Sequence, residues 1–348
     1  MSIVEIAKLA GVSHTTVARV VNSPEDVRPE TVEKVRGVME QVGYVPKPKS
    51  QRRGPKRTSS KGFKTGNVAF LTSSEGFHIL GYSPVMMNVV HGIEEALASY
   101  GMSMIQGTIN SNRQLPPIVS RGEVDGVIIW PDFVDVSEET LEILNNYQRV
   151  YLMTGRERYL SGDRVLNNNE KVGVLAAEYL TLKGHRKILQ IDFDDEHRSK
   201  SAWIERWYGF EEYSSKTEAK RLVVGIRSNE TLQLTLPNEK SIFNSLKEVF
   251  GKDDYPTGIF CTCDSLTAMI YPLIQRMGII IGKDVQIVSC NNERSILAGL
   301  DPLPASIDIC PEEIGRCAVE QLRWRVANPD DTSKRIVEIE PRLVVPGL

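Results

Sequence analysis

The chain has 348 residues, of which 41% are hydrophobic and 25% are charged, and its formal net charge is −3. This length leaves room for a small domain and for a larger body that can bury a core. No apolar run is long enough to span a bilayer, and the first residues begin an amphipathic helix rather than a signal peptide. We therefore expect a cytoplasmic protein.

A helix is predicted to begin almost at the first residue. Ser2 and Glu5 have the spacing of a capping box, in which both side chains bond free amides at a helix start. Apolar residues then recur at helical spacing through Leu9 and Ala10. Gly11 follows where such a helix would stop, at a tight turn that favours a positive φ.

Two further helices are predicted after this turn. Ser13 can cap a second helix that turns Val17, Val20 and Val21 inward. Pro29 suits the first turn of a third helix, whose valines and Met39 form one apolar stripe that ends near Gly43. The first two helices with their turn have the spacing of a helix-turn-helix.

The outward residues of the second helix suit DNA. His14, Thr15 and Arg19 can reach base edges in a major groove, while the hydroxyls of Ser13 and Thr16 suit phosphate oxygens. The alternative is a solvated polar face on a small helical bundle. That alternative leaves the charge of the next segment unexplained.

The segment from 46 to 65 is predicted to be a basic linker. It contains three prolines, two glycines and no acid, so it cannot build a core, and its charge would concentrate near a polyanion. Eight basic residues lie in it: Lys47, Lys49, Arg52, Arg53, Lys56, Arg57, Lys61 and Lys64.

The charge is distributed unevenly along the chain. Residues 1–66 hold 13 of the 42 basic residues and 6 of the 45 acidic residues, which gives +7 there and −10 in residues 67–348. A basic head on an acidic body is typical of a nucleic-acid-binding protein, because neutralised phosphates release their counterions.

The remainder alternates strands with amphipathic helices, which indicates parallel sheets covered on both faces. We expect strands at 67–73, 102–108, 124–130, 149–155, 187–192, 221–226, 258–263 and 285–290. We expect helices near 85–100, 137–147, 170–183, 202–215, 238–250 and 265–277. Two groups of strands suggest two similar lobes, with a ligand bound where the carboxyl ends of the strands face each other.

These residues resemble the LacI-GalR family of bacterial transcription regulators. The head reads IAKLAGVSHTTVARVVN and ends in GYVP, close to that family's helix-turn-helix pattern. Weaker matches follow in the family's order at VDGVII, LTLKGHRKI, ERWYGF, CDSLTAM and EEIGRCAVEQL, so the resemblance covers nearly the whole chain.

The resemblance implies a homodimer whose small-molecule effector, usually a sugar, binds between the lobes of a periplasmic-binding-protein-like body and changes operator affinity. The implied domains are a DNA-binding head at 1–45, a linker at 46–65 and an effector-binding and dimerisation body at 66–348. Family base-reading positions fall on His14, Thr15 and Arg19. Family phosphate-contacting positions fall on Ser13, Thr16, Asn22, Thr31 and Tyr44. Family effector positions fall on Phe77, Tyr82, Ser83, Arg198, Arg206, Asp264 and Asn291.

The linker departs from the family pattern. Two prolines and no leucine in KPKSQRRGPKR make the family's hinge helix and its leucine wedge improbable. The run instead resembles an AT-hook arm, in which Arg52, Arg53, Lys56 and Arg57 would enter the narrow minor groove of A/T tracts. The alternative, which the sequence leaves open, is a tether that adds only non-specific attraction.

The body departs from the family in two places. Asn167-Asn168 stands where the family commonly has an aspartate followed by asparagine, and Asn291-Asn292 stands where the family commonly has two aspartates. Losing these strong acceptors argues against an ordinary neutral sugar. Trp130, Trp203 and Trp207 could stack on a sugar, although such tryptophans more often belong to the core. The segment before VDG is short and contains Pro116-Pro117, which leaves little room for the helix usual there.

Two other functional classes compete with a DNA-binding regulator. A periplasmic-type solute-binding protein shares the expected body architecture, but the basic head and the missing export signal argue against it. An enzyme is disfavoured because the five histidines are scattered and no nucleophile elbow or phosphate loop is present. The cysteines Cys261, Cys263, Cys290, Cys310 and Cys317 read as free thiols, mostly buried, and we expect neither a metal nor a cofactor.

Overall fold

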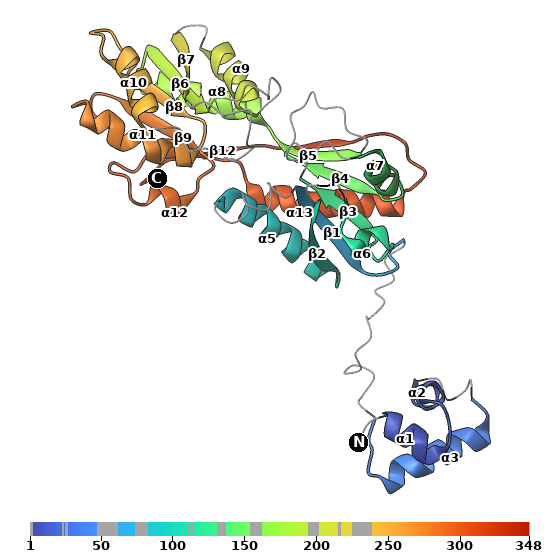
Figure 1. The fold of residues 1–348 in the computed structure, drawn as a ribbon. Coiled ribbons are helices and arrows are strands. Elements are labelled where there is room, and N and C mark those ends of the chain that lie inside the picture. Colours follow the sequence, from blue (N-terminus) through green and yellow to red (C-terminus); the bar gives the residue numbers. More distant parts are fainter. Residues whose placement is uncertain are drawn as a thin grey trace. The chain divides into compact units, whose positions relative to one another are not determined.

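The structure is a computed structural model that divides into two compact units, Met1–Lys56 and Arg57–Leu348 (Figure 1). The division lies inside the predicted linker. The structure describes residues 3–22, 24, 27–46, 62–73, 83–109, 112, 114–130, 137–153, 162–193, 202–214, 217–224 and 239–347.

The first unit is the predicted three-helix head, with α1 at Ile3–Ala10, α2 at His14–Asn22 and α3 at Pro29–Gln41. Its small core is made of Ile6, Ala7, Ala10, Val17, Val20, Val35 and Met39. Leu9 differs from the expectation, because Ile6, Ala7 and Ala10 form the inward face of α1 and leave Leu9 60% exposed.

Two glycines end helices of the head in the same way. Gly11 has φ +59°, and its amide and that of Val12 donate to the carbonyls of Lys8 and Ala7 at 3.3 and 3.0 Å. Gly43 has φ +66° and ends α3 by an equivalent pair of bonds. These bonds satisfy carbonyls that a helix end otherwise leaves free, and they require the left-handed conformation that glycine adopts without strain.

The second unit contains two six-stranded sheets of matching topology. The N-terminal sheet has the order β11-β5-β4-β3-β1-β2 and is parallel throughout. Its strands are β1 (Asn67–Ser73), β2 (Ser103–Ile109), β3 (Gly126–Ile129), β4 (Arg149–Leu152), β5 (Asp163–Asn167) and β11 (Ile336–Ile339). The C-terminal sheet has the order β12-β10-β9-β8-β6-β7, in which β12 alone is antiparallel to its neighbour. Its strands are β6 (Lys187–Phe193), β7 (Glu218–Val224), β8 (Gly258–Cys261), β9 (Gln286–Cys290), β10 (Ala305–Asp308) and β12 (Arg342–Val344).

Helices cover both faces of each sheet, as the near-continuous apolar strands require. The N-terminal lobe packs α5 (Pro84–Ser99) and α13 (Pro311–Ala327) on one face, and α6 (Pro117–Ser120) and α7 (Glu138–Asn145) on the other. The C-terminal lobe packs α8 (Asn169–Leu182) and α9 (Ala202–Tyr213) on one face, and α10 (Glu239–Phe250) and α11 (Asp264–Arg276) on the other. A short helix, α12 (Arg294–Leu297), follows β9.

The chain passes between the lobes from β5 to α8, from β10 to α13, and from β11 to β12. Figure 1 shows α13 and α5 side by side beneath the N-terminal sheet. They touch backbone to backbone, because a Cβ on Gly92 would lie 2.1 Å from the carbonyl oxygen of Glu312. The last helix of the chain is therefore part of the first lobe.

The eight expected strands and six expected body helices are all present, with bounds shifted by a few residues. The strands β5, β10, β11 and β12 and the helix α13 were not predicted as elements. The helix before β3 is a single four-residue turn, α6, as the short Pro116-Pro117 segment indicates.

The start of the body holds the end of the linker in place. The amides of Lys64, Thr65 and Gly66 all donate to the carboxylate of Asp125, at 2.6–3.0 Å. Gly62, with φ +98°, lies so close to the end of α13 that a Cβ there would be 2.8 Å from the carbonyl oxygen of Val326. Residues 62–66 therefore form a strap fixed to the N-terminal lobe.

Four of the five cysteines are buried, Cys317 is half-buried, and all five are free thiols. Across the described part of the chain, no helix is long and apolar enough to cross a membrane.

Candidate DNA-binding and effector sites

The helix α2 has one buried and one exposed face. Val17 and Val20 are 0% and 3% exposed, while His14, Thr15 and Arg19 are exposed. The head core therefore fixes which side of α2 is presented to solvent.

Ser13 organises the start of this helix. Its Oγ accepts a hydrogen bond from the Thr16 amide at 3.1 Å and lies 2.8 Å from Thr16 Oγ1. This is the predicted N-cap, and it places both hydroxyls beside the free amides of the first turn, where an anion is favoured. The same end of α2 therefore presents two of the predicted base-reading residues beside the two hydroxyls predicted to contact phosphates.

The remaining predicted DNA contacts are distributed over the head. Thr31 lies in the first turn of α3 and is half-buried, and Tyr44 packs against the head core beyond Gly43. The side chain of Asn22 and all of Arg52, Arg53, Lys56 and Arg57 lie outside the described residues.

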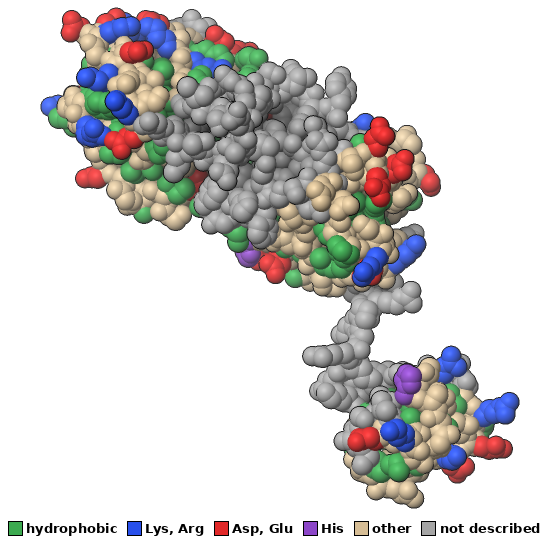
Figure 2. Space-filling view, in the orientation of Figure 1, with side chains coloured by type: hydrophobic (Ala, Val, Ile, Leu, Met, Phe, Trp, Pro, Cys, Tyr) green, Lys and Arg blue, Asp and Glu red, His purple; other side chains and the backbone are tan. Residues whose placement is uncertain are grey.

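The folded head is close to electrically balanced. Its described residues include five basic side chains and four acidic ones. Figure 2 shows side chains of both signs on one face of the head. The excess of +7 in residues 1–66 therefore comes from the linker. The α2 side chains that can hydrogen-bond to DNA therefore lie in a different segment of the chain from most of the positive charge.

Arg206 is the centre of a buried polar cluster in the C-terminal lobe. Its side chain is 3% exposed, its Nε donates to Asn169 Oδ1 at 3.1 Å, and its Nη1 donates to the carbonyl oxygen of Thr262. Asn169 Oδ1 also accepts from Asn167 Nδ2 at 2.6 Å, and Asn169 Nδ2 donates to Glu205 Oε2 at 3.1 Å. Thus α8, α9 and the end of β8 meet at one guanidinium.

Asp264 is a second buried charge at the carboxyl edge of this sheet. It is fully buried at the start of α11 and accepts hydrogen bonds from the hydroxyls of Ser289 and Ser306 and, at 2.6 Å, from the amide of Glu293. Burial raises the pKa of Asp264 to about 6, against the lowering effect of these bonds. Its carboxylate holds the ends of β9 and β10 together.

The structure does not bring all the predicted effector residues into one described site. Arg206 and Asp264 have their partners inside the C-terminal lobe, and Asn291 follows β9 with φ +106°. Ser83 lies at the N-cap of α5 in the other lobe. Phe77, Tyr82 and Arg198 lie outside the described residues.

The asparagines and tryptophans have structural partners. Asn168 caps α8 by accepting from the Lys171 amide at 3.0 Å, and Asn167 is buried against Asn169. Trp130 and Trp207 pack against the cores of their lobes. The guanidinium of Arg206 lies 5.4 Å from the ring centre of Trp203.

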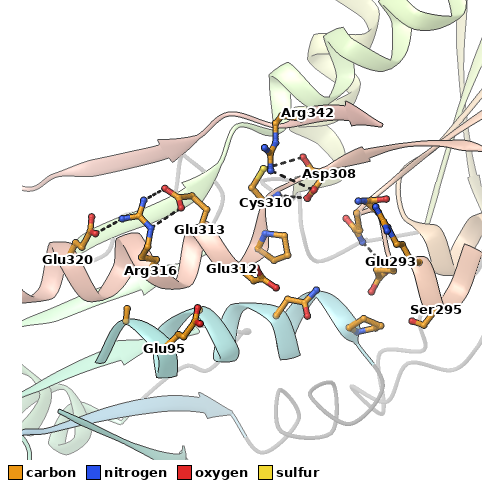
Figure 3. Close-up of a pocket in the computed structure, with 18 of the residues that line it drawn as sticks. Glu95, Glu293, Ser295, Asp308, Cys310, Glu312, Glu313, Arg316, Glu320 and Arg342 are labelled. Carbon is orange, nitrogen blue, oxygen red and sulfur yellow. Dashed lines mark hydrogen bonds and ion pairs between the residues drawn. The ribbon is translucent and has the colours of Figure 1, made fainter. Parts of the chain in front are cut away.

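A groove of about 860 Å³ lies along α5 and the start of α13 (Figure 3). Residues of both lobes line it, and six of them are acidic: Glu95, Glu293, Asp308, Glu312, Glu313 and Glu320. Arg316 and Arg342 offset part of this charge by pairing with Glu313, Glu320 and Asp308. Of the predicted effector residues, Asn291 lines the groove.

Sequence reasoning missed Asn169 and Glu293. Asn169 follows β5, a strand that was not predicted. The sequence therefore did not indicate that Asn169 lies near the carboxyl edge of the N-terminal sheet. Glu293 comes two residues after Asn291, but its contact with the amide of Val85 joins residues 208 positions apart. A sequence pattern carries no signal for such a contact.

Two family models match the chain. The model of bacterial regulatory proteins of the lacI family matches residues 2–47, and the periplasmic binding protein-like domain matches residues 177–346.

Similar curated proteins include the HTH-type transcriptional repressor PurR of Vibrio atlanticus (strain LGP32), 24% identical over 349 residues, covering 99% of this chain and 97% of that protein. The PurR of Vibrio cholerae serotype O1 (strain M66-2) is 25% identical, covering 99% of this chain and 96% of that protein.

Solved structures of similar fold include the lac repressor dimer bound to operator and the anti-inducer ONPF, with a TM-score of 0.64 and 19% identity. Another is the complex of the transcriptional regulator CelR with cellobiose, with a TM-score of 0.62 and 21% identity. Each alignment covers 99% of this chain and 98% of the other. The resemblance seen in the sequence is confirmed: the chain combines a helix-turn-helix head that matches the lacI family of bacterial regulatory proteins with a periplasmic-binding-protein-like body.

Proposed function

We propose that the protein is a sequence-specific DNA-binding transcriptional repressor controlled by a small-molecule effector. The observation that carries this proposal is the exposed polar face of α2, which a buried valine face and a serine cap hold in a fixed orientation. The curated relatives are named as repressors rather than as enzymes.

On DNA, α2 lies in the major groove. His14, Thr15 and Arg19 contact base edges, and the hydroxyls of Ser13 and Thr16 contact phosphates. One small head offers few base contacts, so two heads of a homodimer read a near-palindromic operator. An operator is a chromosomal site, and this function therefore requires a cytoplasmic protein.

The effector binds where the carboxyl ends of the two sheets face each other, as is usual for open parallel sheets. Arg206 and its partner Asn169 form the polar floor on the C-terminal side. A guanidinium can bond a hydroxyl, a carboxylate or a phosphate with paired N–H donors. Because amides stand at three positions where the family commonly has aspartates, an anionic sugar derivative fits this floor better than a neutral sugar.

The effector half of the proposal is tested by thermal shift of the full chain against free sugars, phosphorylated sugars and sugar acids. A compound present at 100 times its Kd stabilises the folded state by about 2.7 kcal/mol. We expect an anionic sugar derivative to raise the Tm and to change operator affinity, and Arg206→Ala to lose both effects. Arg276→Ala, which removes an exposed arginine from the end of α11, is the matched control.

Equal stabilisation of wild type and Arg206→Ala would remove Arg206 from the site. A compound that raises the Tm without changing operator affinity would contradict its role as an effector.

A further inference from the structure

The helix α5 begins without a cap from its own N-terminal residues. Among the described residues, the Ser83 side chain makes no capping bond, and Pro84 has no N–H. The amides of Met86 and Met87 donate to the carbonyl oxygen of Ser83 at 3.1 and 3.2 Å. Val85 therefore carries the first amide that needs a partner from elsewhere.

That partner comes from the other lobe. The Val85 amide donates to Glu293 Oε1 at 3.3 Å. Glu293, which is labelled in Figure 3, is 8% exposed. The Val85 side chain packs in the core cluster that contains Val288 and Ile307 of the C-terminal sheet. The first turn of α5 is thus seated in the C-terminal lobe, with a carboxylate at the positive end of the helix.

Glu293 is held in place by the loop after β9. Its amide donates to Asp264 Oδ2 at 2.6 Å, and its Oε2 accepts from Asn291 Nδ2 at 3.4 Å. Although Glu293 is the N-cap of α12, its carboxylate makes no capping bond to that helix in the described structure. Asn291 and Asn292, the two residues before Glu293, both have positive φ, so the backbone that leads to Glu293 is held in an uncommon conformation.

From α5 the contacts continue to the strap at 62–66. A Cβ on Gly315 would lie 2.2 Å from the carbonyl oxygen of Val89, so α13 cannot keep its packing if α5 shifts. The other end of α13 touches the strap, where Gly62 packs on Val326. A shift of α5 at its first turn is therefore transmitted by rigid helices to the point where the linker joins the body.

We propose that Glu293 is the positioning residue that couples the effector-side loop of the C-terminal lobe to α5 and, through α13, to the strap that carries the DNA-binding head. This inference rests on the proposed function, because Asn291 in this loop is one of the effector positions that the family resemblance implies. Effector contact with Asn291 changes the position of the Glu293 carboxylate, and the first turn of α5 moves with that carboxylate.

The coupling is tested by hydrogen–deuterium exchange of the full chain without DNA or effector. Glu293→Ala removes the acceptor, and Glu293→Asp keeps the charge but shortens its reach. In both variants we expect about tenfold faster exchange in residues 83–90 and also in the strap. Glu293→Gln keeps an amide oxygen at the same reach and restores protection at both places.

Two controls make the result specific. Glu95→Ala removes an exposed acidic side chain from the same groove, on α5 itself, and should leave both segments unchanged. Exchange in α10, which is remote from the contact between Glu293 and Val85, reports whether each variant is folded. If Glu293→Ala fails to fold, Glu293→Asp and Glu293→Gln decide the question.

Unchanged exchange at 83–90 would overturn the capping contact. Faster exchange at 83–90 with an unchanged strap would overturn the coupling and leave Glu293 as a helix cap. Because neither readout involves DNA, both outcomes are independent of whether the head binds an operator.

Discussion

Arg19 is the only lysine or arginine in α2, and its side chain is exposed on the face opposite Val17. A guanidinium paired with a base edge contributes roughly 1–3 kcal/mol of discrimination between bases. We expect Arg19→Ala to weaken operator binding by that amount and to bind random DNA almost as well as before. Fluorescence anisotropy with an operator and a scrambled duplex of the same composition measures both affinities.

The control for this variant is Arg36→Ala, which removes the same charge from the exposed side of α3. It should change binding to both duplexes alike, because the charge of an exposed arginine attracts phosphates without reading the sequence. If Arg19→Ala also loses affinity equally for both duplexes, Arg19 does not read bases.

Asp264 makes stability depend on pH. Its pKa is about 6 in the folded protein, above its ordinary value of 3.8, because burial disfavours the charged form. Between these pH values the folded protein binds more protons than the unfolded chain. The contribution of Asp264 to the free energy of unfolding therefore falls as the pH rises from about 4 to 6, by about 2–3 kcal/mol in all.

Asp264→Asn removes this titration while keeping the size of the side chain. We expect urea unfolding at pH 4.5 and pH 7.5 to give a smaller loss of stability with rising pH in the variant than in the wild type. Parallel pH dependences would mean that Asp264 titrates at its ordinary value in the folded protein.

At the scale of elements, the contact between α5 and α13 depends on two glycines. A methyl group at Gly92 would lie 2.1 Å from a backbone oxygen of α13, which cannot move aside as a side chain could. We expect Gly92→Ala to separate the helices and lower the free energy of unfolding by about 2 kcal/mol or more. Chemical denaturation monitored by circular dichroism checks this expectation.

Gly37→Ala serves as its counterpart. Gly37 lies inside α3, and no described atom comes within 4 Å of the position its Cβ would take. Alanine should stabilise the head by about 0.5–1 kcal/mol, because glycine loses more backbone entropy in a helix. A destabilising Gly37→Ala together with a neutral Gly92→Ala would contradict the packing described for both helices.

The sequence predicted elements well where their periodicity is strong. β1 contains the apolar run VAFL and was predicted with its observed bounds, and α10 turns Ile242, Leu246 and Phe250 inward at helical spacing. The strands β10, β11 and β12 have three or four residues each and contain charged or small residues, so no period of two was visible. Tertiary pairing with longer strands decides their conformation.

The exposed face of α2 was more predictable than the buried polar cluster around Arg206. The outward residues of α2 follow from helical geometry and a local cap, because all the interacting residues lie within one turn or two. The cluster around Arg206 joins Asn169 and Thr262, which are 37 and 56 residues away along the chain. Such contacts depend on strand order, which the sequence pattern does not specify.

At the scale of the whole molecule, the positive charge lies in the linker rather than in the folded head. If Arg52, Arg53, Lys56 and Arg57 enter the minor groove, replacing all four by alanine should lower affinity and erase a preference for A/T pairs at that groove. A tether predicts equal loss on every sequence. Both models predict a shallower salt dependence, by roughly 0.9 in slope for each lost phosphate contact.

Two operators that differ only in A/T or G/C content under the linker separate these models. The wild type should prefer the A/T operator, and the quadruple variant should bind both equally. The same preference in both proteins would exclude the minor-groove arm and leave an electrostatic tether.

The central claim is that this chain reads a specific DNA sequence through α2. Selection of bound duplexes from a random library by the full chain tests it most directly. We predict enrichment of a near-palindrome with one half-site for each head of a dimer, and a flattened preference in the selection with Arg19→Ala. Failure to enrich any sequence, or enrichment of the same sequence to the same extent by Arg19→Ala, would contradict the claim.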